Sequence, residues 1–171
     1  MNYNFDEIID RTGTNSLKLE AGEKINPYLP KVYIPLWVAD MDFACAPQIL
    51  AAMHARLDRR ILGYTNLGED CKNSVVRWMQ RRFDWNIDAR EIVFSAGVVS
   101  AIFTAVELLS QPGDGVCFLT PAYHPFEDAV RRQNRNPLYV RLVETNGSWT
   151  IDFNALERTL AREDCKVFIH C

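Results

Sequence analysis

Two short loops, each following an apolar run, carry residue types that could bind an anionic or planar ligand. The first is SAGVV, in which the amides of Gly97, Val98 and Val99 would be the free donors of a following helix. Free amides at a helix start, together with the helix dipole, favour a phosphate group. A single glycine also occurs in strand-to-helix turns that bind nothing, so an ordinary turn stays open as the alternative.

The second loop, TPAYHPF, holds an aromatic ring just past an apolar run. Pro121 and Pro125 stiffen the backbone on either side of Tyr123. A rigid aromatic side chain in this place could stack on a planar ring. The alternative is that Tyr123 only covers the top of the sheet.

The segment WVADMDF places two carboxylates, Asp40 and Asp42, among apolar residues. They could cap backbone amides, form ion pairs or line a cleft. Because aspartate is rarely buried without a partner, a structural hydrogen-bonding role is favoured. Further along, Arg56, Arg59 and Arg60 are interpreted as the solvated face of a helix.

Neither the histidines nor the cysteines have the spacing of metal ligands, so no metal site is predicted. The five cysteines are odd in number and lack a C-x-x-C pair, which also argues against a disulfide framework. The residues concerned are His54, His124, His170, Cys45, Cys71, Cys117, Cys165 and Cys171.

The elements that must position these loops alternate regularly beyond residue 90. The strands are continuous apolar runs, which is typical of a parallel sheet covered on both faces in an α/β fold. Ligands bind beyond the carboxyl ends of such strands, where both loops fall. Strands are predicted at 91–95, 115–119, 137–143 and 166–170, and helices at 98–110, 124–134 and 152–163, the last capped by Asp152.

The chain before residue 90 has a different organisation. Residues 1–46 contain several prolines and no sustained helical period, so we expect an irregular N-terminal arm. Amphipathic helices are predicted at 47–61, which opens on Pro47, and at 71–83.

Composition narrows the function classes further. The 171 residues carry a net charge of −3, which is not basic enough to predict a nucleic-acid partner. No apolar run approaches the roughly 20 residues needed to cross a membrane. The start, MNYNFDEIIDRTG, lacks the layout of a signal peptide, so a cytoplasmic location is expected.

Six segments occur in the order seen in one known family. They are DRTGTNSLKLE, WVADMDFACAPQI, GYTNLGED, VFSAGVVSAI, LTPAYHPF and CKVFIHC. The chain thereby resembles the pyridoxal 5'-phosphate (PLP)-dependent C–S β-lyases of the MalY/PatB type, within the class I/II aminotransferase-like superfamily of fold type I. The resemblance covers the whole chain. It implies that residues 47–171 are the first half of the three-layer, parallel-sheet large domain that binds PLP.

The resemblance also implies roles for individual residues. Gly97, Val98 and Val99 match the loop that holds the cofactor phosphate, and Tyr123 matches the aromatic that stacks on the pyridine ring. Tyr64 matches a tyrosine that reaches the cofactor phosphate of a neighbouring subunit. A homodimer is therefore expected for the full-length enzyme.

The implied reaction, in amino-acid metabolism, is an α,β-elimination on a cysteine S-conjugate. Cystathionine would give homocysteine, pyruvate and ammonia, with Trp37 and Asp40 near the substrate end of the cleft. The Schiff-base lysine of the family has no match here, so we expect a truncated N-terminal fragment that is inactive alone. The five lysines present are Lys18, Lys24, Lys31, Lys72 and Lys166.

Two other functions remain open at this point. An aminotransferase of the same fold would use the same cofactor loops. A non-catalytic fragment that binds the cofactor or another subunit would be a function of a different class.

Overall fold

A computed structural model describes residues 3–171 of the chain. The chain divides into two compact units, Met1–Leu67 and Gly68–Cys171, and each is described by itself. The boundary expected between residues 46 and 47 stays a prediction.

The described part of the N-terminal unit is mostly irregular, with three helices. The short helices α1 (Leu17–Glu20) and α2 (Gly22–Ile25) interrupt the arm, and α3 (Pro47–Leu57) follows it. Pro47 is the first residue of α3, as its fixed backbone angle favours. The helix ends earlier than residue 61, and Arg60 adopts a positive φ of 61°.

The C-terminal unit begins with helices. The helix α4 (Glu69–Phe83) ends at Asp84, which takes a left-handed conformation with φ 50°. A short 3-10 helix, η1 (Ala89–Glu91), follows, and then α5 (Val98–Leu109). The strand predicted at 91–95 is wrong: no described segment pairs with it, and Val93 is 90% exposed.

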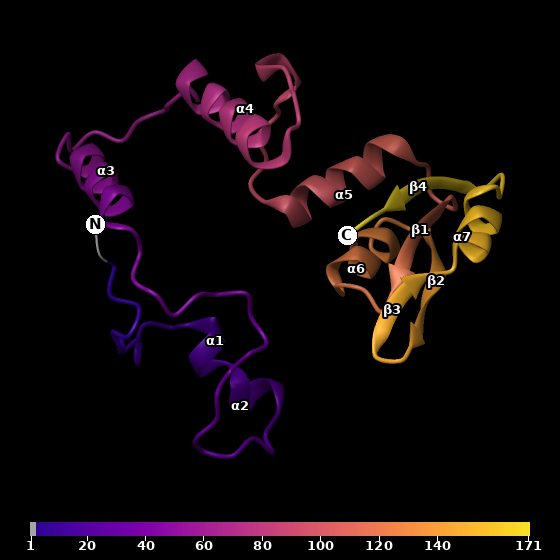
Figure 1. Ribbon diagram of the computed structural model, residues 1–171, viewed down its shortest axis with the longest axis horizontal. Coiled ribbons are helices and arrows are strands. Elements are labelled where there is room, and N and C mark those ends of the chain that lie inside the picture. The colour runs from indigo at the N-terminus through magenta and orange to yellow at the C-terminus, as the bar shows by residue number, and fades with distance from the viewer. Residues whose placement is uncertain (1–2) are drawn as a thin grey trace. The chain divides into compact units, whose positions relative to one another are not determined.

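The other three predicted strands are confirmed as β1, β2 and β4. Together with β3, which was not predicted, they form a four-stranded sheet in the order β3-β2-β1-β4 (Figure 1). The central strand β1 runs parallel to β2 and to β4, which confirms the parallel α/β arrangement. An antiparallel hairpin adds β3 at the edge. The strands are β1 (Gly115–Thr120), β2 (Asn136–Thr145), β3 (Ser148–Ile151) and β4 (Cys165–Ile169), with helices α6 (Pro125–Arg131) and α7 (Phe153–Leu160) between them.

Successive residues of β1 supply two separate apolar cores, one on each face of the sheet. Val116 and Phe118 pack against residues of α5 and α6, among them Val106. Cys117 faces the other way and packs against β2 and α7. Helices therefore cover both faces, as three-layer α/β folds require. The ends of β1 and β4 are consequently held at one edge of the sheet.

Candidate functional site

The start of α5 presents free backbone donors. Gly97 precedes the helix, and its carbonyl accepts from the amide of Ala101 at 3.0 Å. Within the described chain, the amides of Val98, Val99 and Ser100 have no hydrogen-bond acceptor. No side chain caps this helix. An anion with several oxygens, such as a phosphate, could satisfy these donors.

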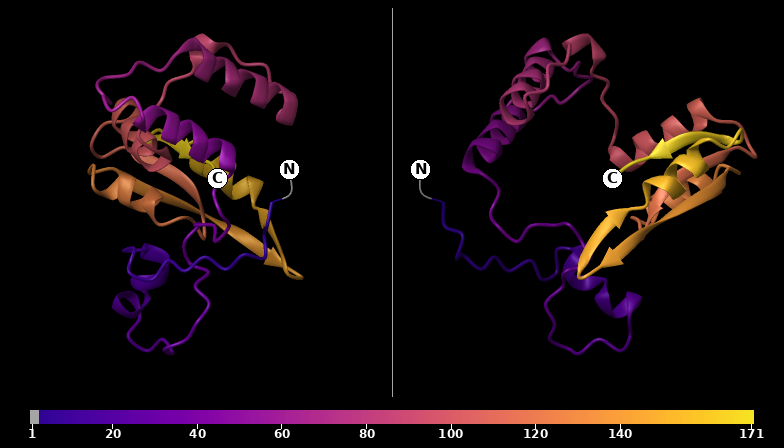
Figure 2. Two further views of the ribbon diagram at one scale, coloured as in Figure 1. Left: turned by 90° about the vertical axis from the view of Figure 1, so that its left-hand side faces the viewer. Right: turned by 45° about the vertical axis from the view of Figure 1, so that its right-hand side comes forward.

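The start of α5 lies on the same side of the C-terminal unit as the end of β4. In Figure 1 and in the right-hand view of Figure 2, the chain's C-terminus lies beside the beginning of this helix. Packing agrees with that placement, since Ile102 of α5 and Ile169 of β4 contact the same apolar cluster. The free amides are thus near the carboxyl edge of the sheet, where ligands bind in such folds.

Tyr123 lines a cavity of about 190 Å³ at that edge. Pro121 and Ala122, which follow β1, line the same cavity with Cys171, which follows β4. Tyr123 is 55% exposed, and its ring lies nearly perpendicular to that of Phe126 at 6.0 Å between ring centroids. Part of the residue is therefore open to the cavity, while its ring is held against the body of the unit. This arrangement suits stacking on a planar ligand.

In the N-terminal unit, the two carboxylates of WVADMDF form ion pairs with residues of the DRTGTNSLKLE segment. Arg11 Nη2 donates to Asp40 Oδ2 at 2.6 Å, and Lys18 Nζ donates to Asp42 Oδ2 at 2.7 Å. Of the roles considered for Asp40 and Asp42, ion pairing is the one that the geometry shows. The hydrogen bond from Arg11 lowers the pKa of Asp40, so this carboxyl stays ionised near neutral pH.

Trp37 and Asp40 are brought together through Lys18. The indole Nε1 of Trp37 donates to the backbone oxygen of Lys18 at 3.2 Å. The ammonium of Lys18 donates to the backbone oxygen of Asp40 at 2.7 Å. Trp37 also lines an apolar cavity of about 360 Å³ in this unit. The pairing of Arg11 and Lys18 with the carboxylates is missed by reasoning from sequence spacing, although the charges are complementary.

Tyr64 is fully exposed and makes no hydrogen bond to a described residue. The turn that carries it is held by Arg56, whose Nη2 donates to the backbone oxygen of Leu62 and, at 2.9 Å, to Thr65 Oγ1. Arg56 is exposed, as its interpretation as part of a solvated helix face expects, and its side chain also binds this turn. Its guanidinium reaches forward from α3 because the chain turns back after the helix ends.

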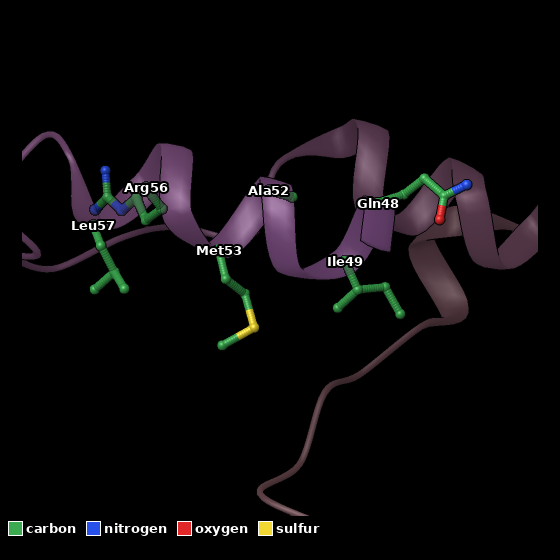
Figure 3. A pocket seen from close by; sticks show the side chains of 6 residues that line it. All are labelled: Gln48, Ile49, Ala52, Met53, Arg56 and Leu57. Atoms are coloured by element: carbon green, nitrogen blue, oxygen red, sulfur yellow. The ribbon is translucent and has the colours of Figure 1, made fainter. Parts of the chain in front are cut away.

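A further cavity, of about 580 Å³, lies along one face of α3. Figure 3 shows Ile49, Met53 and Leu57 projecting from the same side of this helix. The lining is apolar apart from Gln48 and Arg56 and contains no acid or base suited to proton transfer. It is an open apolar helix face rather than a catalytic site.

Among residues 3–171, no group of three or more histidine, cysteine, aspartate or glutamate side chains could hold a metal ion. In the same part of the chain, no helix combines the length and apolar character that crossing a membrane would need.

Comparison with known proteins identifies relatives over nearly the whole chain. The model of the family "Aminotransferase class I and II" matches residues 31–171. Cystathionine beta-lyase PatB of Bacillus subtilis (strain 168) is 38% identical over 168 residues, which are 98% of this chain and 43% of that protein. Protein MalY of Escherichia coli (strain K12) is 28% identical over 99% of this chain and 43% of that protein.

Solved structures of PLP-containing proteins also match over nearly the whole chain. Cystalysin from Treponema denticola, which contains a PLP cofactor, matches with a TM-score of 0.91 and 38% identity, over 98% of this chain and 43% of that one. The PLP-bound C-S lyase from Staphylococcus hominis matches with a TM-score of 0.89 and 34% identity, over 98% of this chain and 42% of that one. The chain thus spans about 43% of the length of the curated relatives PatB and MalY.

Proposed function

The chain belongs to the aminotransferase class I and II family, and we propose that it forms part of a PLP-dependent C–S β-lyase acting on cysteine S-conjugates. The observation that carries this proposal is the set of free amides at the start of α5, on the same side of the unit as the cavity lined by Tyr123. The similarity to PatB and to the two lyase structures supports a lyase as the reaction class.

The residues present fit the cofactor. Gly97 leaves the first turn of α5 without a capping side chain, so the amides of Val98 and Val99 can donate to a phosphate. The half-exposed ring of Tyr123 can cover one face of a pyridine ring. When bound, PLP supplies an electron sink that stabilises negative charge at the α-carbon of an amino acid.

The substrate side is assigned to the N-terminal unit. Trp37 and Asp40 would border the amino-acid thioether, with their segment fixed by Arg11 and Lys18. Tyr64, exposed on its turn, would reach the cofactor phosphate of a second subunit, so the active form would be a homodimer. Cystathionine is the substrate we propose for the test.

We infer that residues 1–171 by themselves do not catalyse the elimination. The reaction needs an unprotonated lysine amine beside the cofactor. Lys18 is ion-paired with Asp42, and the Nζ of Lys166 donates to the backbone oxygen of Glu163 at the start of β4. Lys166 thus lies near the amino end of β4, whereas the cavity lined by Tyr123 lies beyond the carboxyl end of that strand. Lys24 and Lys31 lie in the N-terminal unit, and Lys72 lies on α4.

Product analysis tests the proposed function. The complete gene product is incubated with PLP and L-cystathionine, with and without a 2-oxo acid as amino-group acceptor. A lyase releases homocysteine, pyruvate and ammonia without the acceptor. An aminotransferase, the competing activity in this family, depends on the acceptor, forms a new amino acid and releases no pyruvate. The second pattern would replace the lyase assignment.

A further inference from the structure

Lys18 is an unusual lysine because its side chain is only 7% exposed. Its ammonium donates to the backbone oxygen of Asp40 and to the carboxylate of Asp42, each at 2.7 Å. Its own backbone oxygen accepts from the indole of Trp37. One residue therefore holds the segment from Trp37 to Asp42 through both its main chain and its side chain.

Arg11 completes this cluster. Its guanidinium donates to Asp40 Oδ2 at 2.6 Å and to Ser16 Oγ at 3.0 Å, and it lies 3.5 Å from Asp42 Oδ1. Two cations thus face two carboxylates, and the formal charges of the cluster cancel. Removing the Lys18 ammonium would leave the cluster with an uncompensated negative charge.

Stability alone is a weak reason for such an arrangement. Taking a lysine out of water costs free energy that an ion pair only partly returns, and apolar replacements of buried pairs are often neutral. What the contacts do provide is a fixed backbone. Between Trp37 and Asp40 the chain makes a tight turn, in which the amide of Asp40 donates to the backbone oxygen of Val38 at 2.8 Å. Lys18 binds the oxygen of the residue that closes this turn.

We propose that Lys18 is a positioning residue for substrate binding, which acts by fixing the turn from Trp37 to Asp40 without touching the substrate. This inference rests on the proposed function, in which that turn borders the amino-acid substrate. If the turn is already fixed, substrate binding does not pay the entropy cost of ordering it. The effect of Lys18 should therefore appear mainly in the affinity for the substrate.

The experiment compares Lys18→Met with Lys24→Met in the complete enzyme. Both changes remove an ammonium and keep an unbranched apolar chain, but Lys24 is exposed and makes no side-chain hydrogen bond to a described residue. We expect Lys18→Met to raise KM for cystathionine about tenfold with kcat changed less than about threefold, and Lys24→Met to change neither. A purely structural role would lower kcat with the folded fraction and leave KM unchanged, which would overturn the proposal.

Asp42→Asn provides a second variant in case Lys18→Met folds poorly. Asp42 is 66% exposed, and asparagine keeps an oxygen that can accept from Lys18. Since the charge is lost but the bond to Asp40 remains, we expect a smaller rise in KM, about threefold. An unchanged KM in this variant would also count against the proposal.

A measurement that does not depend on catalysis separates this inference from the proposed function. Acrylamide quenching of Trp37 is obtained as the difference between the protein and its Trp37→Phe variant. We expect Lys18→Met to increase this quenching, because the ammonium bonds that hold the Trp37–Asp42 segment against residue 18 are lost, and Lys24→Met to leave it unchanged. Unchanged quenching in Lys18→Met overturns the positioning role. A wild-type enzyme that forms no pyruvate overturns only the proposed function.

Discussion

The guanidinium of Arg11 and the carboxylate of Asp40, 29 residues apart in the chain, are joined by a hydrogen bond of 2.6 Å. This bond links DRTGTNSLKLE with WVADMDFACAPQI, two of the segments that carry the resemblance to the C–S β-lyases. The opposite charges of the two segments therefore hold together a part of the chain that has little regular secondary structure. This pairing also makes the arrangement of the N-terminal unit sensitive to pH.

Acid should weaken this link. The hydrogen bond from Arg11 lowers the pKa of Asp40 in the folded protein. The stability that the pair contributes is therefore complete above the ordinary aspartate pKa of about 3.9 and is lost as the pH falls through the lowered folded value. We expect the difference in urea midpoint between wild type and Asp40→Asn to be constant from pH 7 to 5 and to shrink below pH 4. A difference that does not change with pH would contradict the assignment.

Proline at the start of α5 tests the phosphate loop. Val98 is the first residue of the helix and follows an extended Gly97, so Val98→Pro should preserve the helix while removing one free amide. We expect its dissociation constant for PLP to rise about tenfold or more, the effect of one hydrogen bond to a charged group. Val98→Ala keeps the amide and is the control. Equal PLP affinity in the two variants would exclude this amide from the cofactor site.

Arg56 should support cofactor binding through the turn that carries Tyr64. We expect Arg56→Gln to weaken PLP binding by the complete enzyme about fivefold, because the bonds to Leu62 and Thr65 weaken. Arg59→Gln is the matched control, since the Arg59 side chain has no hydrogen-bond partner in residues 3–171. In a Tyr64→Phe background the Arg56 effect should largely disappear. An effect that persists in full there would mean that Arg56 acts by another route.

Burial should protect Cys117 from alkylation. Desolvation raises the pKa of this thiol to about 11, and its side chain lies in the core between β1 and α7. Because the thiolate is the reactive form, iodoacetamide at pH 8 should modify the exposed Cys45, Cys71 and Cys171 first. Mass spectrometry of digested protein should find Cys117 labelled only after denaturation. Labelling of Cys117 at the rate of the exposed cysteines would contradict the sheet packing.

Much of the sheet could be predicted from the alternation of apolar runs and amphipathic helices. That rule predicts β1, β2 and β4 but only a turn at Asn146-Gly147. Both turn residues have positive φ, 52° and 78°, as in the tight turns that join antiparallel strands. The Asn146-Gly147 dipeptide is thus also the sequence signal for the edge strand β3, which pairs with β2 across this turn.

The segment 91–95 shows the limit of an apolar run as a signal. Ile92 has the extended backbone angles that the apolar run favours, φ −87° and ψ 119°. A strand also needs a neighbour that exchanges backbone hydrogen bonds, and no described segment provides one. Local sequence cannot supply that information.

The candidate site divides in the same way. The free amides after Gly97 and the position of Tyr123 past β1 follow from where strands and helices end, which sequence patterns predict. The contacts of Lys18 with Asp40 and Asp42 could not be predicted in this way. They join residues more than 20 positions apart in an irregular part of the chain. Only the folded arm shows which charges meet.

The most direct test is to follow pyruvate and thiol together in one reaction of the gene product isolated from its source cell, with its intact mass recorded on the same preparation. If the proposed function holds, L-cystathionine gives pyruvate and homocysteine in equal amounts from the complete enzyme, and residues 1–171 alone give neither. Transfer of the amino group to a 2-oxo acid without pyruvate, or pyruvate release by residues 1–171 alone, would contradict it.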